Sequence, residues 1–446
     1  MPSRERPTWR PKLRSDFDRP IATLAIPAFG SLVAEPLYVL ADTAVVGRIG
    51  TTELAGLALA STVLLTAHAL LIFLAYGATG PIARMIGEGH TSRAATRGVQ
   101  GMWLALILGV AIAGLLALFG DPLLRLLQAE GKVLDAALLY LLVSLPGFPF
   151  LLLALAGAGV LHGRQDTRTP LVIAITSALA NLVIEIVLVF GFGYGLGASA
   201  LATVIAQVGA GVAYVVLVRR WARENGAAMG PERSSMISIL KSGQALVVRT
   251  ASLRGALTFG AAVAASIGTE EIAAHQVGLQ VWFTLALALD AVAIAGQALT
   301  GRYLGEGNPA VAWAASRRMI ELDTVVAVVF GALIAVFREP IAGLFTDDAA
   351  VVSLTGLVLL HVAGQQPING VVFALDGILI GAGDLWFLAK WMVAAFVAFG
   401  AAAAAVIATD AGLGWLWGAL WVFMIVRMVP LYWRWRSGRW LTATTA

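Results

Sequence analysis

Four polar side chains inside apolar stretches could together bind a proton or a sodium ion. Asp42 lies in the first apolar stretch, Asn181 and Glu185 lie four residues apart in a later one, and Thr203 lies in the next. An i,i+4 spacing places Asn181 and Glu185 on one face of a helix. Carboxylate, amide and hydroxyl oxygens can hold Na⁺, or the carboxyl groups can share a proton. By spacing alone, coupling to an ion and hydrogen bonding that only joins helices are equally supported interpretations.

The stretch that carries Asp42 also contains Glu35 and Tyr38. Seven residues is close to two helical turns, so Glu35 and Asp42 point to nearly the same side. We assign Glu35 and Tyr38 to a substrate cavity, with a capping or packing role as the alternative for the two carboxylates. Pro27 and Pro36 lie on the same helix, where either can bend it and free backbone carbonyls as ligands.

A second set of charges lies in the other half of the chain. Charged residues are costly inside a membrane and usually face the protein interior. We assign Arg249, Asp290 and Asp376 to the substrate cavity. Arg249 and Arg254 are five residues apart, about 140° around a helix, so they cannot share one face. A structural ion pair between one of these arginines and Asp290 is the alternative, and the roles of both arginines stay open.

The elements that position these residues are membrane-spanning helices. The chain is 59% hydrophobic and 13% charged, whereas soluble domains carry about 25% charged residues. A span needs roughly 20 apolar residues. We predict an all-α integral membrane protein with twelve transmembrane helices. The expected spans are 20–46, 54–80, 97–119, 137–160, 170–191, 195–218, 237–267, 273–299, 315–337, 351–375, 385–408 and 412–433.

The chain also repeats itself. Residues 49–89 and 267–307 share 13 identities in 41 aligned positions, at a constant offset of 218. Six spans in each half give two lobes that enter the membrane in the same direction, related by a parallel pseudo-twofold axis. We expect the site-forming surfaces to meet between the lobes. The expected segments are a basic N-terminus (1–19), a first lobe (20–218), an interlobe linker (219–236), a second lobe (237–434) and a C-terminal tail (435–446).

The basic residues predict the orientation. Alternate loops on one side, including 427–439, hold 24 of the 30 lysines and arginines. This bias places both termini in the cytoplasm and makes the chain a multi-pass protein of the inner (plasma) membrane. The excess of cations follows the loops, so it indicates topology rather than nucleic-acid binding. The N-terminus does not have the pattern of a signal peptide, and no cluster of catalytic or metal-binding residues predicts an enzyme or a resident cofactor.

Several ordered motifs resemble those of multidrug and toxic compound extrusion (MATE) transporters, specifically the DinF-like branch. Asp42-Thr43 with Gly47, the Asn181–Glu185 element and Thr203 resemble the first-half motifs of that family, in which the helix bends near a proline such as Pro27. The resembling segments of the second half are 249–253, 274–276, 290–297, 301–305 and 376–384.

The resemblance implies a secondary active exporter in which two six-helix lobes open alternately. It implies antiport of lipophilic or cationic compounds against H⁺, with coupling at Asp42, Asn181, Glu185 and Thr203. Position 185 carries Glu where the family usually has Asp, so the side chain is one methylene longer. This extra reach affects whether the site is protonated or forms a compact set of ligands around an ion. We expect protonation of Asp42 to change the bend of the first span and release the cation outside.

Two alternatives stay open within the same superfamily: a Na⁺-coupled antiporter with Na⁺ at the same residues, and a flippase for lipid-linked precursors that binds phosphate through arginines such as Arg249. A passive channel or a membrane enzyme lacks support in the motifs. We expect a monomer in the lipid bilayer whose partners are small substrates.

Overall fold

The computed structural model describes residues 15–442, so most of the expected N-terminal segment and the end of the expected C-terminal tail lie outside the described residues. Within this range, twelve helical stretches are long and apolar enough to cross a membrane. Eleven of them contain an expected span in full, and the twelfth, Leu413–Arg436, begins one residue after the expected start at 412. The prediction of an all-α protein with twelve membrane helices is therefore confirmed.

Three of the six spans in the first half are interrupted. The second span changes direction at Leu71 and Ile72, between α2 and α3. The fourth passes through a 3₁₀ turn at Leu145–Gly147, where Pro146 cannot donate a backbone hydrogen bond. The fifth ends in a π-helical turn. The elements are α1 (Asp18–Val46), α2 (Thr51–Leu70), α3 (Phe73–Gly87), α4 (Thr91–Leu126), α5 (Gly131–Ser144), η1 (Leu145–Gly147), α6 (Phe148–Gly163), α7 (Arg168–Ile186), η2 (Val187–Gly191) and α8 (Gly195–Glu224).

The second half is more regular. Its only non-helical backbone inside a described helix is at Phe337, three residues before Pro340. The elements are α9 (Arg233–Ile267), α10 (Thr269–Gly305), α11 (Pro309–Gly343), α12 (Ala349–Ala382), α13 (Leu385–Ala408), α14 (Leu413–Arg436) and the short η3 (Arg439–Thr442).

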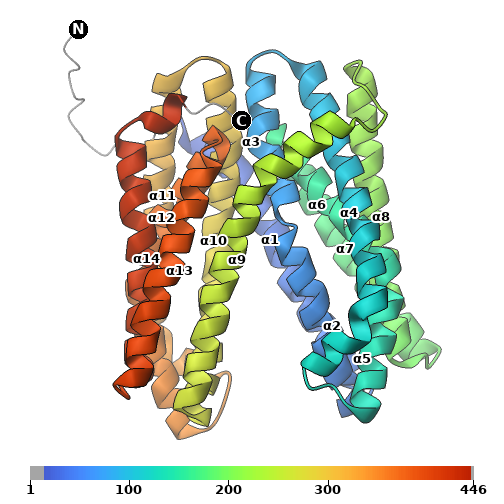
Figure 1. The fold of residues 1–446 in the computed structure, drawn as a ribbon, viewed down its shortest axis with the longest axis vertical. Coiled ribbons are helices and arrows are strands. Elements are labelled where there is room, and N and C mark those ends of the chain that lie inside the picture. Colours follow the sequence, from blue (N-terminus) through green and yellow to red (C-terminus); the bar gives the residue numbers. More distant parts are fainter. Residues whose placement is uncertain (1–14, 443–446) are drawn as a thin grey trace.

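The helices form two lobes that approach each other at one end of the molecule and diverge toward the other (Figure 1). Gly87 of α3 and Gly305 of α10 are 218 residues apart, and both lie at the contact between the lobes. A Cβ on Gly87 would overlap the carbonyl oxygen of Arg302, and one on Gly305 would overlap that of Arg84. Such a reciprocal contact is what a pseudo-twofold axis between α3 and α10 produces.

The segment between the lobes is short and is held against the first lobe. Helical structure extends into the expected linker from both sides, so that only residues 225–232 lie between α8 and α9. The indole of Trp103 on α4 donates to the carbonyl of Met229 (3.0 Å), and Gln100 donates to that of Gly230 (2.8 Å).

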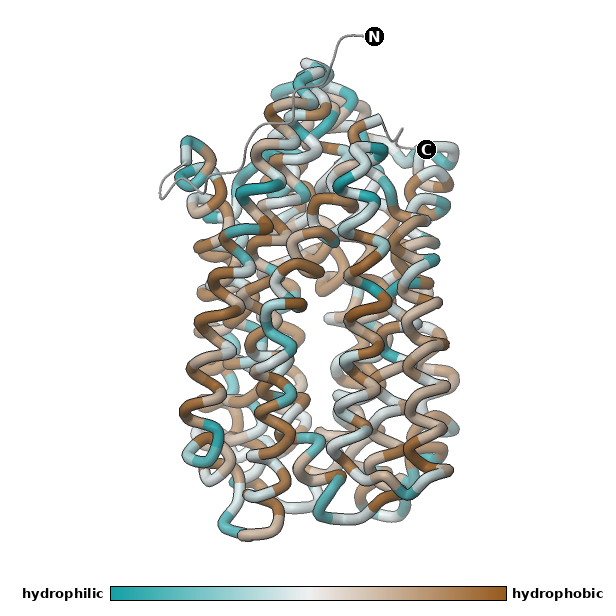
Figure 2. The backbone as a smooth tube through the Cα atoms, turned by 90° about the vertical axis from the view of Figure 1, so that its left-hand side faces the viewer, coloured by the Kyte–Doolittle hydropathy of each residue, from teal (hydrophilic) through white to brown (hydrophobic). Residues whose placement is uncertain are grey.

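The outside of the molecule suits a lipid environment. Hydrophobic residues predominate along the helices, and hydrophilic ones are more common toward the two ends (Figure 2). Large apolar side chains such as Leu118 and Val336 are each 71% exposed. A soluble protein would not leave this many apolar side chains in water, so we treat the chain as a multi-pass membrane protein.

Candidate functional site: a cavity within the first lobe

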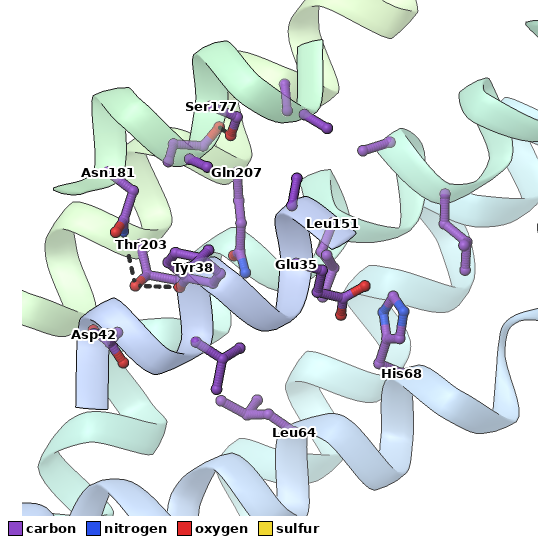
Figure 3. A pocket seen from close by; sticks show the side chains of 18 of the residues that line it. Glu35, Tyr38, Asp42, Leu64, His68, Leu151, Ser177, Asn181, Thr203 and Gln207 are labelled. Carbon is purple, nitrogen blue, oxygen red and sulfur yellow. Dashed lines mark hydrogen bonds between the residues drawn. The ribbon is translucent and has the colours of Figure 1, made fainter. Parts of the chain in front are cut away.

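A cavity of about 320 Å³ lies within the first lobe, between α1, α2, α5, α6, α7 and α8. Its volume is in the range of pockets that hold small ligands. Leu64, Leu151, Leu155 and Ile173 give it an apolar wall, and polar side chains enter from α1, α2, α7 and α8 (Figure 3). We expected the site between the lobes, but every residue that lines this cavity belongs to the first one.

Three of the four predicted coupling residues, Asp42, Asn181 and Thr203, line the cavity, and the fourth, Glu185, is within electrostatic range of Asp42. Asp42 is 5% exposed, and its carboxylate accepts hydrogen bonds from Ser199 Oγ (2.7 Å) and the hydroxyl of Tyr140 (3.5 Å). The hydroxyl of Thr203 accepts from Asn181 Nδ2 at 3.2 Å. The bonds to Asp42 connect α1 with α5 and α8, so a change in its charge acts on these three helices, and the bond between Asn181 and Thr203 joins α7 to α8.

Glu185 is the most buried member of the group. Its side chain is fully buried, and neither carboxylate oxygen has a hydrogen-bond partner among the described residues. Asp42 is near enough for the two carboxyl groups to interact electrostatically. A π-helical turn begins at Val187, two residues after Glu185. Such turns occur often at functional sites because they change the direction of nearby side chains, and the sequence analysis did not predict this one.

Glu35 and Tyr38 line the cavity, as the assignment to a substrate cavity requires. The hydroxyl of Tyr38 lies 2.9 Å from that of Thr203. Because Thr203 donates its single proton to the carbonyl of Ser199, Tyr38 is the donor in this pair. The helix α1 continues without interruption through Pro27 and Pro36, so the bending of α1 stays a prediction.

The charges of the second lobe form a separate cluster. Asp376 accepts from Arg249 Nη2 at 2.5 Å and from Arg427 Nη2 at 2.7 Å. The ion pair considered between one of these arginines and Asp290 is not formed among the described residues, because Arg249 pairs with Asp376 instead. The prediction that Arg427 is a loop cation is wrong, because its side chain is 2% exposed and lies inside the lobe. None of Arg249, Asp290 and Asp376 lines the first-lobe cavity.

Three further charged residues lie within the helices of the second lobe. Asp290 is in electrostatic range of Arg249 and Arg427 but forms no ion pair within residues 15–442. Arg254 is exposed on α9. Asp323 on α11 is not among the residues predicted from the sequence; it is fully buried, and neither carboxylate oxygen has a hydrogen-bond partner among the described residues. Its position in an apolar stretch was the available signal, because a lone acid there is costly.

Comparison with known proteins agrees with this architecture. The family described as MatE matches residues 27–187 and 253–406, which correspond to the two lobes. The chain is 30% identical to "Protein DETOXIFICATION 44, chloroplastic" of Arabidopsis thaliana, with 94% of this chain and 83% of that protein covered. It is 29% identical to "DNA damage-inducible protein F" of Escherichia coli, with 96% and 95% covered.

The fold is also that of solved transporters. An outward-facing structure of a multidrug resistance MATE transporter matches with a TM-score of 0.86 at 23% identity, covering 97% of this chain and 98% of that one. The family match covers most of the chain, both lobes are present, and DinF-like proteins are among the relatives. This chain therefore belongs to the MATE family of multidrug and toxic-compound exporters.

Proposed function

We propose that the chain is a secondary active antiporter that exports lipophilic cations in exchange for H⁺ by alternating access. The observation that carries this proposal is the pair of buried carboxyl groups, Asp42 and Glu185. Asp42 lines an otherwise largely apolar cavity, and Glu185 is within electrostatic range of Asp42. Two carboxylates without a fixed cation are costly to bury when both are charged. A proton or a bound cation removes this cost, so the proton and the cation compete for the same negative charge.

The hydrogen bonds that Asp42 accepts provide a route from protonation to movement. Neutralising Asp42 weakens its acceptance from Ser199 and Tyr140, because bonds to a charged acceptor are stronger. The helix α1 is then freer to bend at Pro27 or Pro36. Bending would narrow the cavity and release the cation on the side where the lobes diverge, which the bias in basic residues places outside the cell.

Coupling to Na⁺ is the second candidate. The oxygens of Asp42, Asn181, Glu185 and Thr203 are of the type that binds hard cations. Against an ion cage, Asn181 directs its amide nitrogen at Thr203, and Glu185 is a residue type with a longer side chain than the family usually has here. These features favour protonation.

A flippase for lipid-linked phosphates has less support. Recognition of phosphate uses arginine or lysine. Among the described residues that line the cavity, none is a lysine or arginine. Arg249, the expected phosphate ligand, is bonded to Asp376.

Transport into liposomes that contain only this protein tests the proposal. A fluorescent lipophilic cation is supplied outside, and a pH gradient and a Na⁺ gradient are imposed separately. We expect accumulation with the pH gradient alone. Accumulation that requires Na⁺ would select the second candidate, and no response to either gradient would contradict antiport of such cations.

A further inference from the structure

The first-lobe cavity has a second acidic group, distant from Asp42. Glu35 lies two turns before Asp42 on α1, which separates the two carboxyl groups by about 10 Å along the helix. Its side chain lines the cavity and is not part of any hydrogen bond or ion pair within residues 15–442. The apolar side chains Leu64 and Leu151 lie along the wall of the same cavity.

His68 of α2 faces this carboxylate. The two side chains point toward one another across the space between α1 and α2 (Figure 3). The Nδ1 atom of His68 is buried and has no hydrogen-bond partner in the described part of the chain. No ion pair within 4.0 Å joins His68 to Glu35, so the two groups face each other without being bonded. An unbonded acid and an unbonded imidazole in one cavity are unexplained by the coupling site at Asp42.

Few other titratable groups face this pair. The cavity itself adds Asp42 and Tyr38 on α1, Tyr140 on α5 and Tyr214 on α8. Beyond the cavity, Tyr76 on α3 is in electrostatic range of Glu35 and also of Asp290 on α10, Arg249 and Asp376. Among the described lining residues, His68 is therefore the one side chain that can carry a positive charge. Imidazole is also the side chain that gains or loses its charge between about pH 5 and pH 8.

We propose that Glu35 and His68 form a pH-controlled binding point for the positive charge of a lipophilic organic cation, separate from the coupling site at Asp42. This inference rests on the proposed export of cations. With His68 neutral, Glu35 binds the cation, while the apolar body of the ligand lies along Leu64 and Leu151. With His68 protonated, the imidazolium pairs with Glu35 and displaces the ligand. A low pH on the side where the cation is released thus lowers the affinity for the cation at Glu35 as well as at Asp42.

Equilibrium binding of ethidium to the purified full-length protein tests this proposal. Ethidium is permanently charged, so its own charge does not change with pH. The background carries Asp42→Asn and Glu185→Gln, which removes titration at the coupling site. In this background, the affinity for ethidium should fall about tenfold from pH 8 to pH 5.5, because the imidazolium of His68 competes with ethidium for the carboxylate of Glu35. Adding His68→Gln should abolish this fall.

Adding Glu35→Gln should instead weaken binding at pH 8 by about tenfold, since the charged acceptor is lost. His90→Gln and Glu130→Gln make the same chemical changes at exposed positions outside the cavity and should alter neither value. If the background protein does not fold, the same His68 and Glu35 comparisons are made in the wild-type chain, where His68→Gln should reduce the pH dependence.

A pH dependence unchanged by His68→Gln, or an affinity unchanged by Glu35→Gln, would overturn the proposal. Failure of the proposed function gives a different result, namely no accumulation of the cation by the wild-type protein under either gradient.

Discussion

Asp376 shows why a buried carboxylate in this chain need not contact substrate. It neutralises two arginines at once, Arg249 and Arg427, on two different helices. Its own side chain is 6% exposed, so the three charges are largely removed from water. Removing one member of such a group leaves the others uncompensated in the protein interior, which costs more than the intact group contributes.

We therefore predict that Asp376→Asn destabilises the protein by about 3–5 kcal/mol, because Arg249 and Arg427 lose their common partner. Thermal unfolding in detergent should show a clearly lower midpoint. Asp347→Asn, the same change at an exposed residue of a loop, is the matched control and should leave the midpoint unchanged. An unchanged midpoint for Asp376→Asn, together with lost binding of the cation, would instead indicate contact with substrate.

Residues that belong to a recognisable motif were predictable from the sequence. Residues whose partners depend on how the helices pack were not. Asp42, Asn181, Glu185 and Thr203 were selected from their spacing and from the family resemblance, and they do lie together. Ser199 and Tyr140, the donors to Asp42, carry no signal of their own, because hydroxyl groups are common in helices. The pairing of Arg249 with Asp376 depends on how α9 and α12 are placed, which spacing along the chain does not contain.

The helix α1 is the element on which the proposed mechanism depends. Pro27 has no backbone N–H, so the carbonyl of Thr23 lacks its usual partner one turn later. In the structure this carbonyl accepts from the hydroxyl of Thr167, at 3.5 Å. A long bond of this kind holds the helix loosely at the proline, which suits a helix that must change shape.

We predict that Pro27→Ala makes α1 stiffer, since alanine restores the missing hydrogen bond and proline costs about 3 kcal/mol more than alanine inside a helix. Gradient-driven uptake of the cation should fall several-fold, while the midpoint of thermal unfolding does not fall. Pro430→Ala is the control, because it makes the same change within α14, away from the cavity. Full uptake by Pro27→Ala would show that bending at this proline is not required.

The spans were predictable because hydrocarbon demands a minimum apolar length. Their interruptions were not. Leu71 and Ile72 end α2 without any proline or glycine at those positions, so the change of direction comes from packing. The π-helical turn after Glu185 likewise contains no proline from which it could have been predicted.

The lobes contact each other through α3 and α10, where glycines allow the backbones to approach. We predict that Gly87→Ala disrupts this contact, because the new methyl group would overlap the backbone of Arg302, which cannot move as a side chain can. A cost of about 1–3 kcal/mol is expected for such overpacking. The unfolding midpoint should fall, and the lobes should close less readily at this end.

Gly114→Ala is the comparison, since no atom lies within 4 Å of the methyl group it would add. It should be neutral or slightly stabilising, as alanine favours a helix. Equal stability of the two variants would contradict the role assigned to the α3–α10 contact.

The architecture of the whole molecule was predictable from the internal repeat, and the position of the cavity was not. The 218-residue offset predicts two related lobes, and Gly87 and Gly305 keep equivalent positions in them. A repeat also suggests a site on the axis between the lobes. The cavity lies in the first lobe because the polar residues there, such as Asp42, have no equivalent in the second: Gly260 occupies the matching position.

The central claim is that the charge of Asp42 couples the proton gradient to export. The most direct measurement compares wild type and Asp42→Asn in liposomes by two assays, accumulation driven by a pH gradient and exchange of labelled for unlabelled cation without a gradient. We predict that Asp42→Asn keeps the exchange, which shows a folded and mobile protein, but loses accumulation at least tenfold. Accumulation by Asp42→Asn at the wild-type level would contradict the account.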